Sequence, residues 1–121
     1  MHTTGVDIVE IPRLSKVLTR WGEKFLRRVY TQREISFCRD HLPELAVRFA
    51  GKEAVMKALG TGNRGVTWKE IEILPMRGGK PMVHLHGRAK VRAEKIGLHD
   101  MSISLSHSEE NAIAMVVGEM A

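Results

Sequence analysis

The sequence lacks the features of a secreted, disulfide-stabilised or membrane-spanning protein. It contains a single cysteine, Cys38, which excludes an internal disulfide and suits a reducing compartment. No run of about 18 apolar residues occurs, so no membrane-spanning helix is predicted. The first residues lack a basic segment followed by an apolar one, so no signal peptide is expected. These absences predict a cytoplasmic protein without a membrane partner.

Aromatic side chains and nucleophile motifs are also scarce. Only 3 Phe, 2 Trp and 1 Tyr are present, which leaves few rings on which nucleic-acid bases could stack. The sequence contains no G-x-S-x-G motif or similar nucleophile signature. It therefore favours neither a single-strand nucleic-acid platform nor an enzyme that uses a serine of its own as nucleophile.

What is present is an ordinary globular composition with a basic charge balance. The 121 residues, 43% hydrophobic and 27% charged, predict one domain over residues 1–121. Nineteen Lys and Arg residues against 14 Asp and Glu give a net charge of +5. Such a chain favours a polyanionic partner, which leaves open a nucleic acid, a phosphorylated cofactor or an acidic protein.

The hydrophobic pattern changes between strand and helix periods along the chain. Strands are expected over residues 5–11, 68–74, 82–86, 101–107 and 112–117. Helices are expected over residues 13–30, with a break or bend at Gly22, and over 31–41, 44–59 and 87–96, with Leu42-Pro43 as a junction. This order predicts an α+β fold with mostly antiparallel strands.

Two carboxylates stand out against their surroundings. Asp7 lies in an otherwise apolar strand, where Asp is disfavoured. Glu53 and Lys57 are four residues apart in the helix 44–59 and therefore share a face; an exposed ion pair is the simpler interpretation. Two carboxylates from different elements plus a phosphate oxygen are, alternatively, a common Mg²⁺ arrangement.

The glycines and histidines carry weaker signals. Gly60, Gly62 and Gly65 match the spacing of a dinucleotide-binding loop, but they follow a helix instead of opening one, so a helix stop is expected. A glycine loop that lets a ligand approach the backbone is the alternative. His107 ends a strand, where exposure and ligand contact are equally good interpretations, and the strand pair His84 and His86 is expected to face solvent.

Four segments in order, spanning almost the whole chain, resemble the holo-[acyl-carrier-protein] synthase family, the small stand-alone 4′-phosphopantetheinyl transferases. They are Gly5 to Ile11, Arg48 to Gly62, Gly79-Lys80-Pro81 and Ser104 to His107. Gly51 departs from the family, which usually has Ala there, at an expected cost of about 0.5–1 kcal/mol of helix stability.

The resemblance implies an activity in fatty acid biosynthesis and assigns roles to residues. It implies transfer of the phosphopantetheine arm of coenzyme A to a serine of apo acyl carrier protein. Asp7 and Glu53 would hold Mg²⁺, and Glu53, or a water that it orients, would take the serine proton. Lys57 would neutralise charge on the leaving phosphate. The residues implied to contact coenzyme A are Arg48, Lys57, Gly60, Thr61, Gly62, Lys80, Pro81 and His107.

Two surfaces are predicted to bind proteins. The strand 112–117 is apolar on both faces and so needs cover on both sides; together with the resemblance, which implies shared sites between subunits, this predicts a homotrimer. A basic ridge on the first helix, beside an apolar stripe from Leu14 to Phe25, is usually a solvated face but here predicts a dock for an acidic carrier protein. Its members are Arg13, Lys16, Arg20, Lys24 and Arg27.

Three alternatives stay open at this stage. A basic nucleic-acid-binding module without enzymatic activity would explain the charge but not Asp7 and Glu53. A related transferase could serve the carrier domain of a polyketide or peptide synthetase. An inactive scaffold subunit is disfavoured because Asp7, Glu53 and Lys57 are all intact.

Overall fold

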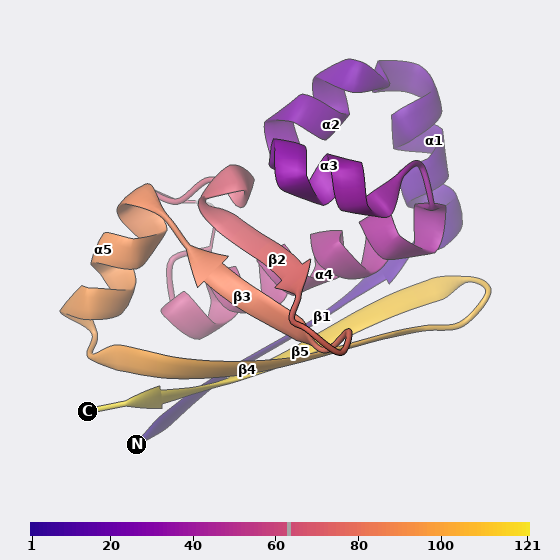
Figure 1. Cartoon of the computed structure of the whole chain (residues 1–121). Helices are drawn as coiled ribbons and strands as arrows, with labels where there is room; N and C mark the ends of the chain where they lie inside the picture. Colours follow the sequence, from indigo (N-terminus) through magenta and orange to yellow (C-terminus); the bar gives the residue numbers. More distant parts are fainter. Residues whose placement is uncertain (63) are drawn as a thin grey trace.

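A computed structural model describes residues 1–62 and 64–121 of the chain (Figure 1). The elements follow in the order β1 (His2–Glu10), α1 (Ile11–Trp21), α2 (Glu23–Val29), α3 (Gln32–Cys38), α4 (Leu42–Leu59), the 3₁₀-helix η1 (Trp68–Glu70), β2 (Ile71–Pro75), β3 (Pro81–Leu85), α5 (Gly87–Lys95), β4 (Leu98–His107) and β5 (Asn111–Met120). The predicted α+β class with antiparallel pairing is confirmed. No helix within the described ranges has the length and apolar character needed to cross a membrane.

The strands form two antiparallel sheets around α4. The larger sheet has the order β1-β5-β4, so β1 and β4 are its two edges, and β2 and β3 form a separate hairpin. Helix α4 packs on one face of the larger sheet and also contacts α1, α3, α5 and β2 (Figure 1). The short helices α1 to α3 gather at one end of the sheet, and α5 lies at the other end together with both termini.

Local sequence signals explain most of the observed helix boundaries. Several of these boundaries differ from those expected from the sequence. Gly22 adopts φ 51° and splits the predicted helix 13–30 into α1 and α2. Thr31 accepts a hydrogen bond from the Glu34 amide and donates its own amide to the Glu34 carboxylate, a capping box that starts α3 as predicted. The interpretation of Leu42-Pro43 as a junction is wrong, because Pro43 sits in the first turn of α4, where a missing amide costs nothing.

The other differences from the expected boundaries are small: some elements are shorter or longer than expected, and one short segment adopts a different secondary structure. Helix α3 ends at Cys38, three residues before the expected end, and residues 68–70 form a 3₁₀ turn instead of the start of a strand. Strands β4 and β5 extend to Leu98 and Met120, beyond the expected ranges. Cys38 is buried, and burial raises the pKa of its thiol to about 11, which fits a packing role.

Two glycines bring α4 against its neighbours. A Cβ at Gly5 would overlap the backbone carbonyl of Ala54, so only glycine lets β1 cross α4 this closely. This contact places Asp7, two residues later, over the same helix. A Cβ at Gly51 would press on the side chain of Ile73 and touch Ile103, so neighbouring apolar groups fill the space that an alanine at this position would need.

One face of the larger sheet is left uncovered within the chain. Alternate residues of β5 (Ala112, Ala114 and Val116) are fully buried under α4, whereas the residues between them point to the opposite face. That face exposes a group of large apolar side chains, here called the open sheet face: Val6, Ile8, Ile113, Met115 and Val117. Trp21 is also 52% exposed, so its expected place in the apolar stripe that anchors α1 is wrong.

Candidate active site

The structure brings Asp7 and Lys57, from the first two of the four family-like segments, into direct contact. Lys57 Nζ lies 3.1 Å from Asp7 Oδ1 and donates a second hydrogen bond of 2.8 Å to the carbonyl of Val6. Glu53, one turn earlier on α4, faces the same side of the helix. The simple Glu53–Lys57 ion pair is not what forms among the described residues, since Lys57 pairs with Asp7 instead.

The pKa of Glu53 responds to the charge of the nearby Asp7 carboxylate. Burial, and then repulsion by the Asp7 carboxylate, raise the pKa of Glu53 above its ordinary value, while the Trp68 side chain and the charge of Lys57 act in the opposite direction. We call Asp7, Glu53 and Lys57 the carboxylate cluster. Beside it lies a cavity of about 590 Å³ lined by Asp7, Arg13 and apolar side chains that include Phe25 and Phe49.

A second group of the predicted residues lies around another cavity, of about 220 Å³. Arg48, Pro81 and His107 line it, together with Gly79 and Phe37, and we call Arg48, Pro81 and His107 the β4-edge cluster. Lys80 stands next to it in the exposed turn between β2 and β3. Arg48 is only 3% exposed: its Nε donates to the carbonyl of Ile73 at 3.0 Å and its Nη1 lies 2.6 Å from Glu44 Oε1.

The two clusters do not meet within one chain. Lys57 follows Arg48 by nine residues, which at 100° per residue places the two side chains on opposite sides of α4. Asp7 belongs to β1 and His107 to β4, the two opposite edges of the larger sheet. The structure therefore separates the residues that the sequence assigned to one coenzyme A site into two halves.

The glycine loop after α4 adjoins the carboxylate cluster. Gly60 ends α4 with φ 74°, in the left-handed region that glycine tolerates, and Gly62 and Gly65 also have positive φ. The predicted helix stop is confirmed, and the position of Gly60 at the end of a helix, instead of directly after a strand, excludes the dinucleotide-binding interpretation. Thr61 lies in this loop, four residues after Lys57, and Asn63 lies outside the described residues.

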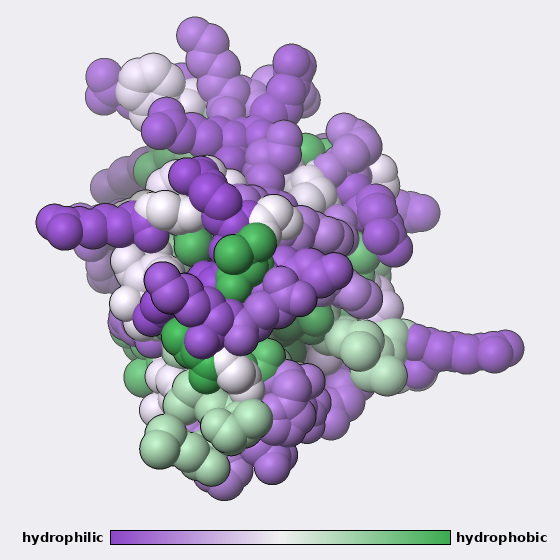
Figure 2. Space-filling model, turned by 90° about the vertical axis from the view of Figure 1, so that its left-hand side faces the viewer, coloured by the Kyte–Doolittle hydropathy of each residue, from purple (hydrophilic) through white to green (hydrophobic). Residues whose placement is uncertain are grey.

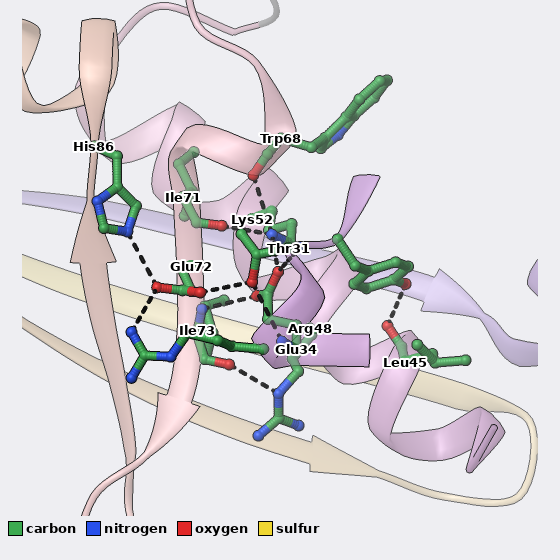
Figure 3. Close-up of polar contacts among 12 residues, drawn as sticks. Thr31, Glu34, Leu45, Arg48, Lys52, Trp68, Ile71, Glu72, Ile73 and His86 are labelled. Atoms are coloured by element: carbon green, nitrogen blue, oxygen red, sulfur yellow. Dashed lines mark hydrogen bonds and ion pairs between the residues drawn. The ribbon is translucent and has the colours of Figure 1, made fainter. Parts of the chain in front are cut away.

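Besides Arg48, helix α4 buries a charged residue that the sequence analysis did not single out, Lys52. Lys52 is 0% exposed and its ammonium lies 2.7 Å from Glu34 Oε1 (Figure 3). It also donates hydrogen bonds to the carbonyls of Trp68 and Ile71. Burial lowers the pKa of Lys52, and the Glu34 carboxylate opposes that shift. All three donors of the ammonium are thereby satisfied.

This buried pair holds one edge of the β2–β3 hairpin. Glu34 Oε2 accepts the amide of Ile73 at 2.8 Å, Lys52 donates to the carbonyl of Ile71, and Arg48 donates to the carbonyl of Ile73 (Figure 3). The backbone groups of β2 that β3 does not pair are thus satisfied by side chains of α3 and α4. The hairpin that carries Pro81 is fixed against α4 by these bonds.

The hairpin also buries a carboxylate of its own, Glu72 on β2. Glu72 alternates with the apolar residues Ile71 and Ile73 yet is itself buried, with Thr31 donating to it at 2.6 Å and His86 Nε2 at 3.1 Å (Figure 3). Burial opposes its ionisation, yet the hydrogen bonds from Thr31 and His86 hold its pKa below the ordinary value. His86 therefore bonds to protein, and no group of three metal-ligating side chains occurs in residues 1–62 and 64–121.

The buried pair yields a stability prediction. Lys52→Met alone should destabilise the fold by about 3–5 kcal/mol, because it leaves the Glu34 carboxylate buried without its counter-ion. Lys52→Met combined with Glu34→Gln should cost less than the sum of the two single changes by at least about 1 kcal/mol. Urea unfolding of the three variants measures this coupling, and strictly additive costs would contradict the assignment of the pair.

The predicted basic ridge is divided by the break at Gly22. Arg13, Lys16 and Arg20 lie on α1, whereas Lys24 and Arg27 lie on α2, so they do not form the one continuous helix ridge that was expected. Arg13 pairs with Glu10 and Arg27 with Glu23, both at exposed positions. All five basic side chains are exposed, and Arg13 reaches the cavity beside Asp7.

Comparisons with known proteins agree with these observations. The family model of the 4′-phosphopantetheinyl transferase superfamily matches residues 3–116. A holo-[acyl-carrier-protein] synthase of Herpetosiphon aurantiacus is 48% identical over 125 residues, with 98% of each chain covered. One of Dehalococcoides mccartyi is 48% identical over 119 residues, covering 98% of this chain and 99% of the relative.

Solved structures give the same result. The holo-[acyl-carrier-protein] synthase of Neisseria meningitidis superposes with a TM-score of 0.90 at 34% identity, covering 97% of both chains. That of Helicobacter pylori, solved in complex with coenzyme A, gives a TM-score of 0.88 at 34% identity, covering 96% of this chain and 99% of the other. The resemblance noted from the sequence is confirmed, and the nucleic-acid-binding alternative gains no support. The chain belongs to the 4′-phosphopantetheinyl transferase superfamily and, within it, to the holo-[acyl-carrier-protein] synthase family of enzymes.

Proposed function

We propose that this chain transfers the 4′-phosphopantetheine group of coenzyme A to the serine of an apo acyl carrier protein and releases adenosine 3′,5′-bisphosphate. The observation that carries the proposal is the carboxylate cluster, in which Asp7, Glu53 and Lys57 meet from β1 and α4 in a chain of this family. The attacking hydroxyl belongs to the carrier protein, which explains why the chain has no nucleophile motif of its own.

The carboxylate cluster has the composition expected of a Mg²⁺ site. Mg²⁺ is usually held by one or two carboxylates together with substrate phosphates and waters, so two carboxylates suffice. Burial and the Asp7 carboxylate both raise the pKa of Glu53, and the two carboxylates together supply negative charge that a cation would neutralise. When bound, the metal would stabilise charge on the pyrophosphate of coenzyme A.

The residues of the chain then have distinct tasks in the transfer. The serine oxygen forms a bond to the phosphorus that carries the pantetheine arm, and the bond from that phosphorus to the bridging oxygen of the pyrophosphate breaks. The displaced phosphate is the 5′-phosphate of the adenosine 3′,5′-bisphosphate that leaves. Glu53, or a water hydrogen-bonded to it, accepts the serine proton. The Lys57 ammonium lies beside Asp7 and neutralises charge that builds up on the leaving phosphate.

The separation of the two clusters supports a shared site between copies of the chain. We assign the carboxylate cluster and the 60–62 loop to one subunit and the β4-edge cluster with Lys80 to its neighbour, so that coenzyme A bridges both. Arg48 contributes positive charge to the second half near the 3′-phosphate. The open sheet face supplies the apolar surface for this assembly, a homotrimer, since such a contiguous apolar face is unusual on a monomer.

The direct test is a transfer assay with purified components. The protein is incubated with coenzyme A, Mg²⁺ and an apo acyl carrier protein, and the carrier is examined by intact mass spectrometry. The carrier mass should rise by one phosphopantetheine arm, and adenosine 3′,5′-bisphosphate should appear in equal amount. A parallel reaction with a peptidyl carrier domain separates the two carrier classes. No mass change with any carrier would refute the proposed function.

The basic side chains of α1 yield a prediction about the carrier protein. The double change Arg13→Glu with Arg20→Glu should raise the apparent KM for an acidic carrier several-fold and slow association, with the largest effect at low salt. Exposed ion pairs are worth only about 0.2–1 kcal/mol each, so either single change should be mild. The KM for coenzyme A should not move. Lys90→Glu combined with Lys95→Glu on α5 is the matched control. Normal transfer by the Arg13/Arg20 variant at low salt would exclude α1 as the docking surface.

A further inference from the structure

The loop 60–62 lies at the unfavourable end of a helix for a phosphate-bearing ligand. It directly follows the C-terminus of α4, where the helix dipole places about half a negative charge. Phosphates are usually bound at helix N-termini, where backbone amides and the positive end of the dipole attract them. A coenzyme A site at the end of α4 therefore requires additional positive charge close to Gly60.

The last turn of α4 shows where one such charge comes from. Backbone amides of residues 60 and 61 satisfy the carbonyls of Met56 and Lys57. The hydroxyl of Thr3 donates to the carbonyl of Ala58 at 2.8 Å. The remaining carbonyl, that of Leu59, accepts a 2.9 Å hydrogen bond from Nε of Arg92 on α5. Arg92 is thus held at the end of α4 by a bond that uses only one of its five N–H donors.

The Nη2 group of Arg92 lies beside the loop. A Cβ at position 60 would lie 3.4 Å from Nη2 of Arg92, so the guanidinium lies directly beside Gly60. In residues 1–62 and 64–121, Arg92 forms no ion pair with a carboxylate. Lys57, the other cation of this turn, is already bound to Asp7 and to the carbonyl of Val6. Arg92, unlike Lys57, therefore keeps its charge available to a ligand at the loop.

The surroundings of Arg92 keep it in place while leaving it reachable. Ala89 and Ala93 are buried and anchor α5 to the core, and Arg92 is partly exposed. Figure 2 views the end of the molecule that carries α5, where hydrophilic side chains cover most of the surface. A guanidinium fixed through Nε presents its two Nη groups as a planar fork, which matches the spacing of phosphate oxygens.

We infer that Arg92 is a phosphate-binding residue of the coenzyme A site, with Nε capping α4 and the Nη groups binding a phosphate of the ligand at the 60–62 loop. The inference rests on the proposed function only for the identity of the ligand. It adds a residue from α5, an element that no sequence motif connected with the site.

The test compares Arg92→Gln and Arg92→Lys with the wild-type protein. Gln keeps an N–H donor but loses the charge, and Lys keeps the charge but loses the fork. Loss of a charge-assisted hydrogen bond should raise the KM for coenzyme A roughly tenfold in Arg92→Gln and less in Arg92→Lys, with little change in kcat. Calorimetric titration with coenzyme A should show the same order of Kd values. Lys90→Gln, the same charge change two residues earlier on α5, should leave both constants unchanged.

The phosphate involved is identified with 3′-dephospho-coenzyme A. If Arg92 binds the 3′-phosphate, the tenfold difference between the wild-type protein and Arg92→Gln disappears with this ligand; if it binds the pyrophosphate, the difference persists. Either result supports the inference. Unchanged KM and Kd in Arg92→Gln together with a lowered Tm would overturn it, because Arg92 would then only cap α4. Arg92-dependent binding of coenzyme A without any transfer would retain the inference and refute the proposed function.

Discussion

Replacing Asp7 with Ala, or Glu53 with Gln, is expected to reduce transfer at least on the order of a hundredfold while the fold stays intact. The two carboxylates come from β1 and α4, and each supplies charge that the other cannot replace. Gln at position 53 keeps the size of the side chain but neither neutralises a cation nor accepts the serine proton. Removing Asp7 also takes away the 3.1 Å partner of Lys57, so the ammonium loses its fixed position.

The measurement is the transfer rate at increasing Mg²⁺, together with Tm. For Asp7→Ala, higher Mg²⁺ should recover part of the rate, since the weakened site still has Glu53; for Glu53→Gln it should recover little, since proton acceptance is lost as well. Glu94→Gln, a change of the same kind at an exposed position of α5, is the control and should behave like the wild-type protein. Near-full activity of Glu53→Gln at saturating Mg²⁺ would refute the assignment of the cluster.

The elements with strong local signals were predictable from sequence, and those set by distant contacts were not. The long apolar pattern of α4 and the Thr31 capping box were correctly interpreted because their determinants lie within a few residues. Whether Gly22 bends or divides a helix depends on its backbone conformation, which the pattern does not specify. The burial of Glu72 is not visible in the strand pattern, because its partner Thr31 lies 41 residues away.

In the candidate site, too, residue types were predictable from the sequence, whereas contacts between distant residues were not. Asp7 was singled out as an unusual residue type, but its contact with Lys57 depends on the close crossing of Gly5 over Ala54, about 50 residues apart in sequence. Lys52 was overlooked, although the expectation that charges on an enclosed helix need partners applied to it best. Arg92 belongs to none of the sequence motifs, and its position at the loop becomes visible only through its hydrogen bond to the carbonyl of Leu59.

The second prediction with a large expected effect concerns the open sheet face and the assembly of subunits through it. Met115 on β5 lies at the centre of this face and is 51% exposed. It stands opposite Val6 of β1, and the neighbouring Ile113 stands opposite Ile8. Across β4 the neighbours are serines, among them Ser104 opposite Met115, so the apolar group ends at a polar margin. A patch with an apolar centre and a polar margin has the composition of a subunit interface.

The change Met115→Asp is therefore expected to yield a folded monomer that has lost at least on the order of a hundredfold in transfer. The side chain points away from α4, so the charge does not enter the core of the chain, but it would be buried without a partner between subunits. Transfer should fail because the carboxylate cluster and the β4-edge cluster lie on opposite sides of α4, and in the proposed trimer they complete one site between two chains. Light scattering should give about three times 13.6 kDa for the wild-type protein and 13.6 kDa for the variant.

Val91→Asp, which charges a 62% exposed apolar residue of α5, is the matched control and should remain trimeric and active. A wild-type protein that is monomeric and fully active at micromolar concentration would refute both the trimer and the shared site.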